Sequence, residues 1–579
     1  MKKLLLFTLI LSLNVLAQQK IDFTTPFEKS NGLETATYQE CIAFYTKLAT
    51  AYPEINIQPM GLTDSGKPLH LVLFSADKNF DLKDARNTKK AVLLINNGIH
   101  PGEPDGIDAT MMLMRDIVQN KKLKRAYKNV LIAVIPVYNI GGSLNRNSTT
   151  RTNQNGPLSY GFRGNACNFD LNRDFIKNDT KNAQTFARIF HYLNPDVFID
   201  NHVSNGADYQ YVLTHLFTQH NKLGGALGTY LHNEMMPAVL SDLHKKGIDA
   251  TPYVNVFNQV PEVGFSQFMD SPRYSTGYTT LFNTLGMMVE THMLKAYRPR
   301  VEVTYQLMKS VIKFAETNRA QIKAMRKVAT ANFLKQKTYQ LSWQVDSTKT
   351  STLQFKGYKG TYIKSDVTGL TRLKYYRDKP FTKPVTYYDY FKPKTVVDIP
   401  KAYIIPQGFW PVIKRLKLNG IKMTALKKDT IINVTSYHIA DYKTRTRVYE
   451  GHYLHYNTKV SNNQEKLKFS KGDLYISTNQ DGLRYLLETL EPSAPDSFFN
   501  WNFFDTILQE KEGFSPYVFE DLAVTILADN PQLKKDFKAK QKSDAKFAKN
   551  WYAQLYYIYN HSKHKEKAFL RYPVYRIVD

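Results

Sequence analysis

The sequence predicts an α/β fold: a mixed, largely parallel sheet flanked by helices, followed by a β-rich C-terminal domain. In the first half of the chain, short continuous apolar runs alternate with helical patterns, as in a buried sheet that is covered on both faces. After about residue 330 the chain is rich in Tyr, Thr, Val and Lys, with short alternating stretches and many turn signals. The 579 residues are 42% hydrophobic and 22% charged, which is typical of a chain that buries a core.

The first half contains four apolar runs that we predict to be strands of the buried sheet, and an earlier segment that also has strand character. Helical spacing of apolar residues appears before, between and after these runs. In chain order, the predicted elements are a helix at 38–48, strands at 70–74 and 91–95, a helix at 107–118, strands at 130–137, 196–200 and 286–289, and a closing helix at 301–327.

The change in pattern near residue 330 suggests a domain organisation. We predict a signal peptide at 1–17, a sheet-containing domain at 18–328, and a β-rich accessory domain with a mixed α/β tail at 329–579. A helical stretch is expected around 544–559 within that tail. No linker rich in Gly and Ser marks the boundary, and no internal repeat is present.

The N-terminus indicates export. Lys2 and Lys3 precede a short apolar stretch that ends at Ala17, and polar residues follow. Secretory signal peptides have this arrangement, and the stretch is too short to cross a bilayer. The alternative is a buried N-terminal helix. We therefore expect a secreted or periplasmic protein without a transmembrane anchor in its mature chain.

The charge and the two cysteines narrow the interpretation further. A net charge of +27 is compatible with nucleic-acid binding, but the only dense basic run, Lys535–Lys549, lacks a nucleic-acid fold signature. We favour a basic exported protein with no nucleic-acid partner. Cys41 and Cys167 could form one disulfide in an oxidising compartment, although two free buried thiols are the preferred prediction.

Ionisable residues follow three of the predicted strands. His100 and Glu103 come after the strand at 91–95, His202 after the strand at 196–200 and Glu290 after the strand at 286–289. Functional side chains gather beyond the carboxyl ends of strands in an open parallel sheet. Two His and one carboxylate, with an open fourth position, form a catalytic zinc set. The sequence therefore predicts one zinc ion per chain, with the remaining carboxylate available as a base.

The order of these residues, together with the segment Asp170-Leu171-Asn172-Arg173, resembles the zinc carboxypeptidases of the carboxypeptidase A-like family. The resemblance covers about residues 30–325 and does not extend to the C-terminal part. It implies that His100, Glu103 and His202 bind zinc and that Glu290 is the general base. It also implies that Asn172 and Arg173 hold the terminal carboxylate of a peptide or protein substrate.

Three further roles implied by the resemblance are less clearly located. An arginine that stabilises the oxyanion is expected, and Arg163 is preferred over Arg151 and Arg146. A substrate-contacting tyrosine is also expected, with Tyr274 and Tyr278 as the two candidates. The position about twenty residues before Glu290, where the family often has this tyrosine, is in a neighbourhood that holds Phe268.

Three functions remain open from the sequence. The first is an exported zinc carboxypeptidase, a hydrolase that acts on C-terminal peptide bonds. The second keeps the metal site but acts as an amidase or peptidase on cell-wall peptides or other acyl-amino acids. The third is an inactive binding protein on a peptidase scaffold, which the retention of Glu290 beside all three ligands disfavours.

Overall fold

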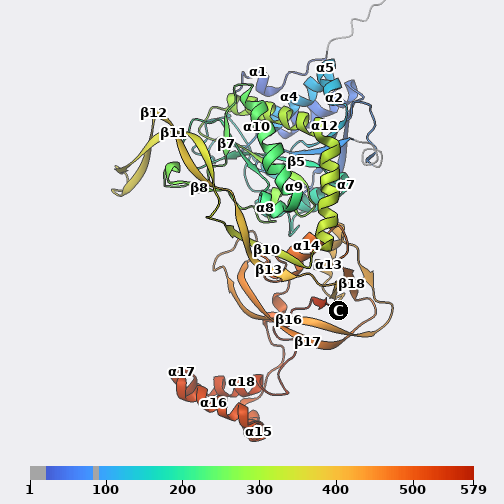
Figure 1. Cartoon of the computed structure of the whole chain (residues 1–579), viewed down its shortest axis with the longest axis vertical. Helices are drawn as coiled ribbons and strands as arrows, with labels where there is room; N and C mark the ends of the chain where they lie inside the picture. The colour runs from blue at the N-terminus through green and yellow to red at the C-terminus, as the bar shows by residue number, and fades with distance from the viewer. Residues whose placement is uncertain (1–20, 83–89, 579) are drawn as a thin grey trace, which may run out of the picture.

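A computed structural model describes residues 21–82 and 90–578. The predicted signal peptide at 1–17 lies outside the described residues. Figure 1 shows three parts along the long axis: a part with a central sheet, a β-rich part beside it, and a small group of helices at the far end. Among the described residues, no helix is long and apolar enough to cross a bilayer.

An eight-stranded mixed sheet forms the centre of the first part, in the order β1-β2-β4-β3-β5-β9-β6-β7. Its four middle strands, β4, β3, β5 and β9, are parallel to one another, whereas β1, β2 and β6 run antiparallel to their inner neighbours. The strands are β1 Ile55–Leu62, β2 Pro68–Phe74, β3 Ala91–Asn96, β4 Val130–Ile135, β5 Val197–Ser204, β6 Leu213–Phe217, β7 Ala250–Pro252 and β9 Leu285–His292.

Helices cover this sheet, so the predicted fold class is confirmed. α4 and α12 pack against each other and against β3 and β5, while α7 packs against β1 and β2. The strands β3, β4 and β5 are buried along their whole length, which explains their continuous apolar runs. The helices are α1 Pro26–Lys29, α2 Tyr38–Ala51, α4 Asp105–Gln119, α5 Lys121–Ala126, α6 Ile140–Leu144, α7 Lys181–Leu193, α8 His220–Leu223, α9 Gly225–Tyr230, α10 Met236–His244, α11 Ser275–Thr280 and α12 Tyr297–Lys335.

The closing helix is longer than the sequence pattern predicts. α12 continues to Lys335 and ends shortly before β10, the first strand of the β-rich part. The boundary proposed at residue 328 therefore falls inside a continuous helix. The division of the chain into domains stays a prediction.

The β-rich part contains three small sheets. β10 pairs with β13, and the long β11–β12 hairpin pairs with β8, a short strand of the preceding region, at Phe265–Ser266. The third sheet has the order β15-β18-β14-β19-β16-β17. The bounds are β10 Thr338–Val345, β11 Ser351–Lys364, β12 Thr371–Tyr388, β13 Phe391–Asp398, β14 Ala402–Ile405, β15 Thr424–Ala425, β16 Thr430–Thr444, β17 His455–Phe469, β18 Leu474–Ser477 and β19 Tyr575–Ile577, with helices α13 Trp410–Leu418 and α14 Leu483–Leu490.

Four short helices with their own small core form the group at the far end in Figure 1. They are α15 Pro516–Asp529, α16 Pro531–Ser543, α17 Ala545–Ala548 and α18 Trp551–Asn560. The stretch predicted as one helix at 544–559 is divided, because Asn550 caps the start of α18 by accepting from Ala553 N.

The two cysteines do not pair. Cys41 is buried in α2 as predicted, but Cys167 is exposed. The prediction of two buried thiols is therefore wrong for Cys167, which precedes the Asp170–Arg173 segment in a loop rather than in a core element.

Candidate active site

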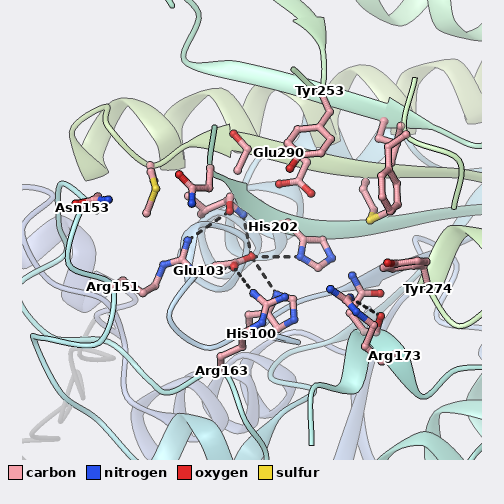
Figure 2. A pocket seen from close by; sticks show the side chains of 18 of the residues that line it. His100, Glu103, Arg151, Asn153, Arg163, Arg173, His202, Tyr253, Tyr274 and Glu290 are labelled. Atoms are coloured by element: carbon pink, nitrogen blue, oxygen red, sulfur yellow. Dashed lines mark hydrogen bonds and ion pairs between the residues drawn. The ribbon is translucent and has the colours of Figure 1, made fainter. Parts of the chain in front are cut away.

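The predicted metal ligands converge at the end of the parallel strands (Figure 2). His100 and Glu103 lie in the loop between β3 and α4, as expected from the sequence. The positions of His202 and Glu290 differ from the prediction. Both residues lie within β5 and β9, near the carboxyl ends of these strands, rather than beyond the strand ends. They are register partners on these neighbouring strands. The sheet thus holds the base candidate directly beside a ligand candidate.

His100, Glu103 and His202 form a compact donor set in which all three side chains are buried. One ligand atom from each lies within 4.8 Å of the other two. Oε2 of Glu103 lies 3.3 Å from Nδ1 of His100 and 3.2 Å from Nδ1 of His202. It also accepts a hydrogen bond from the backbone N–H of Val203 at 3.0 Å.

Two further carboxylates hold the opposite sides of the imidazole rings. Nε2 of His100 lies 2.9 Å from Asp170, and Nε2 of His202 lies 2.9 Å from Asp200. A neutral imidazole that donates from Nε2 has its lone pair on Nδ1. Both lone pairs then face the Glu103 carboxylate, so acceptor faces acceptor unless a metal ion or a proton lies between them. Burial lowers the pKa of His202, but Asp200 and Glu103 raise it well above its ordinary value, as expected of an imidazole held between two carboxylates. This donor set fits zinc, and the outer carboxylates are those that orient metal-bound His.

Two arginines neutralise Glu103 from its other side. Nη1 of Arg151 lies 2.8 Å from Oε1 of Glu103, and Nη1 of Arg163 lies 3.3 Å from the same oxygen. Burial raises the pKa of Glu103, but His100 and Arg151 hold it well below its ordinary value. Arg163 also donates to Asp170 at 2.9 Å and is more exposed than Arg151, 45% against 16%. Both candidates for the oxyanion role line the pocket.

Arg146, the third arginine considered, does not reach the pocket. Its guanidinium donates to backbone carbonyls of Thr35, Ala36 and Ser159 and fixes the loop that precedes Arg151. A structural role therefore accounts for it.

Glu290 has no direct cationic partner among the described residues. Burial is the largest cause that raises its pKa. His202 and Arg163 oppose it while the Glu103 and Asp200 carboxylates add to it, and together these effects raise the pKa to about 7. Its neighbours thus leave the carboxylate poised to exchange a proton near neutrality.

Asn172 and Arg173 lie in the short 3₁₀ turn Leu171–Arg173 on the opposite wall of a pocket of about 500 Å³. Nη1 of Arg173 donates to the carbonyl of Asn172 at 2.8 Å, and its guanidinium lies 4.6 Å from the ring centroid of Tyr274. The amide oxygen of Asn172 accepts from the backbone of Ser275 at 3.1 Å. The stacked guanidinium keeps further donors available to a carboxylate.

Comparison with known proteins finds a related family. Residues 41–199 match the family described as zinc carboxypeptidase. The resemblance to the zinc carboxypeptidases is confirmed. The chain is also 20% identical over 501 residues to Carboxypeptidase 2 of Trichophyton rubrum, covering 82% of this chain and 86% of that protein. Carboxypeptidase 2 of Trichophyton equinum is 21% identical over 500 residues, covering 82% and 85%.

Solved structures with weaker overall similarity include proteins named carboxypeptidases. A putative carboxypeptidase A from Shewanella denitrificans OS-217 is 16% identical, with a TM-score of 0.36, over 50% of this chain and 69% of that chain. A metallo-carboxypeptidase from Pseudomonas aeruginosa is 12% identical, with a TM-score of 0.37, over 50% and 70%.

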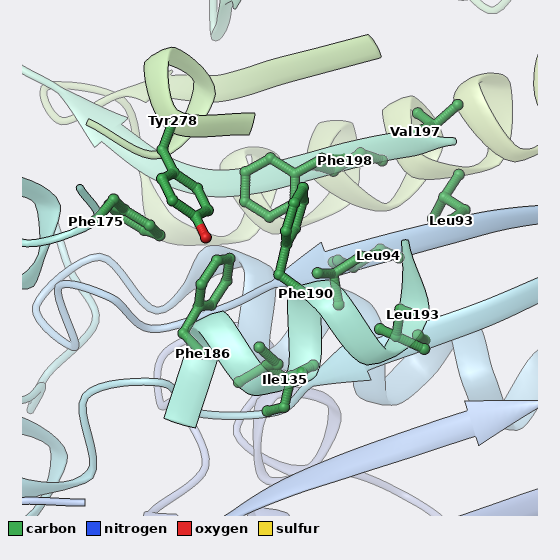
Figure 3. Packing of buried hydrophobic residues seen from close by; sticks show 14 of the residues in the cluster. Leu93, Leu94, Ile135, Phe175, Phe186, Phe190, Leu193, Val197, Phe198 and Tyr278 are labelled. Carbon is green, nitrogen blue, oxygen red and sulfur yellow. The ribbon is translucent and has the colours of Figure 1, made fainter. Parts of the chain in front are cut away.

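The two tyrosines predicted to contact the substrate of a zinc carboxypeptidase have different environments. Tyr274 lines the pocket beside Arg173, together with Phe268. Tyr278 does not: its side chain is fully buried in an aromatic cluster with Phe175, Phe186 and Phe190 (Figure 3). Its hydroxyl donates to Asn419. The prediction for Tyr278 is therefore wrong, because α11 turns this residue toward the core.

Several residues of the site were not assigned a role from the sequence. Tyr253 lines the pocket near Glu290, directly after β7, but a three-residue strand gives no pattern to find it. Asp200 could have been found, since it stands two residues before His202 on the same face of β5. Glu450 is the least expected, because it comes from the C-terminal part and its Oε2 accepts from Asp170 N at 2.8 Å.

Proposed function

We propose that this chain is an exported zinc metallocarboxypeptidase that hydrolyses C-terminal peptide bonds, with Glu290 as general base. The observation that carries the proposal is the convergence of Nδ1 of His100, Nδ1 of His202 and Oε2 of Glu103, with Glu290 in register beside His202. Zinc held by His100, Glu103 and His202 supplies Lewis acidity at this position. Family membership supports peptide hydrolysis, and export rests on the N-terminal sequence.

The chain's own groups account for the remaining requirements. Arg173 and Asn172 offer donors for a terminal carboxylate at one end of the pocket. Arg151 and Arg163 place positive charge near Glu103, where negative charge develops when a peptide carbonyl is attacked. Glu290 accepts a proton from the attacking water and returns it to the leaving amine.

The free terminal carboxylate of the substrate distinguishes a carboxypeptidase from an amidase on the same scaffold. Arg173→Lys keeps the charge but removes the planar pair of donors, so kcat/KM for free-acid peptides should fall roughly 10-fold, about 1.4 kcal/mol. Matched peptides with amidated C-termini should be poor substrates for both proteins. The measurement is kcat/KM for acid and amide pairs with zinc-loaded wild type and variant, after elemental analysis shows about one zinc per chain.

Two results would contradict the proposal. Absence of bound zinc, with full activity in excess chelator, would remove the metal mechanism. Equal cleavage of acid and amide peptides by the wild type would replace exopeptidase action by an endo-acting or cell-wall amidase activity.

A further inference from the structure

A second cavity of about 1480 Å³ lies in the C-terminal region, and we call it the basic cleft. Its walls are β13, the adjoining ends of β16 and β17, and the loop that connects these two strands. We call the pocket that contains His100, Glu103 and His202 the metal pocket. No described residue lines both the basic cleft and the metal pocket. The cleft is therefore a separate site, and the resemblance to zinc carboxypeptidases assigns nothing to it.

The lining of the basic cleft is strongly cationic. Lys459 pairs with Asp441 at 3.2 Å, and Arg273 and Arg576 pair with buried carboxylates behind the wall. The other four cations, in contrast, take part in no ion pair among the described residues. Seven cationic side chains line the cleft, Arg273, Lys394, Lys443, Arg445, Arg447, Lys459 and Arg576, against two acidic ones, Asp398 and Asp441.

Uncompensated cations that share one concave wall repel each other and attract anions. Lys394, Lys443 and Arg447 are exposed, and Arg445 lies over the ring of Tyr449 at 4.7 Å. Water and salt screen this repulsion in part, and a ligand that brings negative charge reduces it further. The first requirement for the occupant is thus several carboxylates or other anionic groups, spaced along a chain.

Two strands that each have one unpaired edge line the same cleft. In the described part of the chain, β13 pairs only with β10, and β17 pairs only with β16. Five consecutive residues of β13, 394–398, and six of β17, 455–460, line the cavity. Because side chains alternate between the two faces of a strand, consecutive lining residues indicate that the main chain of these strands also borders the cavity. An unpaired edge offers main-chain donors and acceptors to an extended polypeptide.

Apolar and aromatic side chains alternate with the cations along these walls. Val396 is 50% exposed, Val448 is 60% exposed and Tyr456 is 42% exposed. Nε1 of Trp343 is buried at the wall and has no hydrogen-bond partner among the described residues. Together these groups suit a chain that carries both apolar and anionic side chains.

We propose that the basic cleft binds an extended acidic peptide segment. The segment pairs with the free edge of β13, and its carboxylates contact Lys394, Lys443, Arg445 and Arg447. The strand edges favour a peptide over an acidic saccharide or a single-stranded nucleic acid, because neither of these can extend a sheet by main-chain hydrogen bonds. The proposal does not depend on the metal pocket or on its reaction.

The test uses the full mature chain and a fluorescent peptide that alternates Glu and Val. An amidated C-terminus and excess chelator separate this binding from the metal pocket. Changing Lys394, Lys443 and Arg447 together to Gln should weaken binding roughly 10-fold. The matched control changes Lys534, Lys535 and Lys542 to Gln, three exposed cations of the helical group, and should alter the affinity less than 2-fold.

Two further arms test the class of ligand. N-methylation of alternate peptide bonds in the probe should weaken binding, since it removes the donors that pair with a strand edge. The proposal is overturned if N-methylation has no effect, if both triple variants weaken binding equally, or if a uronate oligosaccharide or single-stranded DNA displaces the probe at lower concentration than the unlabelled peptide does.

Discussion

The metal pocket and the basic cleft are both lined by charged side chains, but they differ in how those charges are compensated. In the metal pocket, Arg151 and Arg163 already contact Glu103, and Asp170 and Asp200 already hold the two imidazoles. In the basic cleft, four cations have no acidic partner among the described residues. The charged groups of the metal pocket are therefore held in a fixed geometry before a ligand binds, whereas the cations of the basic cleft remain available to a ligand.

Glu290 is the exception within the metal pocket. It is a carboxylate in buried surroundings without a direct cationic partner among the described residues, and its pKa rises to about 7. The three members of the donor set are each held by a partner, whereas the Glu290 carboxylate has no hydrogen bond or ion pair among the described residues and is free to exchange a proton.

The largest expected effect comes from Glu290→Gln. The amide is nearly isosteric but cannot accept a proton, so kcat should fall roughly 100-fold to 10,000-fold. Zinc content and peptide affinity should stay close to those of the wild type. Turnover near the wild-type value in a zinc-loaded variant would show that another group is the base. Glu290 would then not differ in role from the other charged groups of the metal pocket.

The second effect is a pH dependence. Glu290 must be ionised to accept a proton, so kcat/KM should decrease about 10-fold per pH unit below its pKa. Burial and the charged neighbours together raise that pKa from 4.5 to about 7 without metal, and a bound dication lowers it. The apparent pKa of the acidic limb should therefore lie between these two values.

The pH measurement needs a control for metal loss. Zinc content at each pH separates protonation of Glu290 from release of the ion, because His100 and His202 also take up protons when the metal leaves. A profile that is flat down to pH 4.5 with zinc retained would contradict the assignment.

The sequence predicts both the central sheet and the convergence of His100, Glu103 and His202, and for the same physical reason. Fully buried parallel strands appear as uninterrupted apolar runs, and functional side chains follow near their carboxyl ends. His100 and Glu103 were predictable from this rule alone. Tyr278 was not, since a tyrosine near the pocket and a tyrosine in the core have the same local sequence, and only the direction of α11 decides between them.

The basic cleft illustrates what a sequence pattern cannot supply. Its cations come from residue 273, from β13, from the end of β16 and the loop after it, from β17 and from β19, so only Lys443, Arg445 and Arg447 are close together in the sequence. The dense basic run that the sequence does show, Lys535–Lys549, lies instead in the group of short helices around α16 and α17. A dense run of cations in the sequence therefore does not show where cations gather in the folded protein.

The tight turn at Tyr449–His452 contributes residues beside both sites. A substitution in this turn should have the smallest of the expected effects, a change in zinc affinity. Tyr449 and His452 pair through backbone hydrogen bonds of 2.8 and 3.1 Å, with Glu450 and Gly451 between them at positive φ of 50° and 79°. This is the geometry of a tight hairpin turn, in which Gly is favoured. Tyr449 lines the basic cleft, while Glu450 accepts a hydrogen bond from the backbone of Asp170.

Positive φ and the close approach to Phe169 favour glycine at position 451. A Cβ at Gly451 would stand 3.0 Å from the ring of Phe169, the residue before Asp170. His452 lies 2.8 Å from Asp179 and holds the turn against the same segment. The C-terminal part therefore supports the backbone of Asp170 directly, and Asp170 in turn holds His100.

We expect Glu450→Ala to weaken zinc binding roughly 3-fold, because the loss acts on His100 only through Asp170. Asp170→Asn, one step nearer to the metal, should cost roughly 10-fold to 100-fold. Glu450→Gln keeps an oxygen acceptor for Asp170 N and should restore most of the affinity. Zinc affinity is measured by competition with a chelator, with Glu520→Ala on the exposed surface of α15 as the matched control. If Glu450→Ala binds zinc as the wild type does, then the hairpin anchors the C-terminal part without adjusting the metal site, and the two sites are neighbours without being coupled.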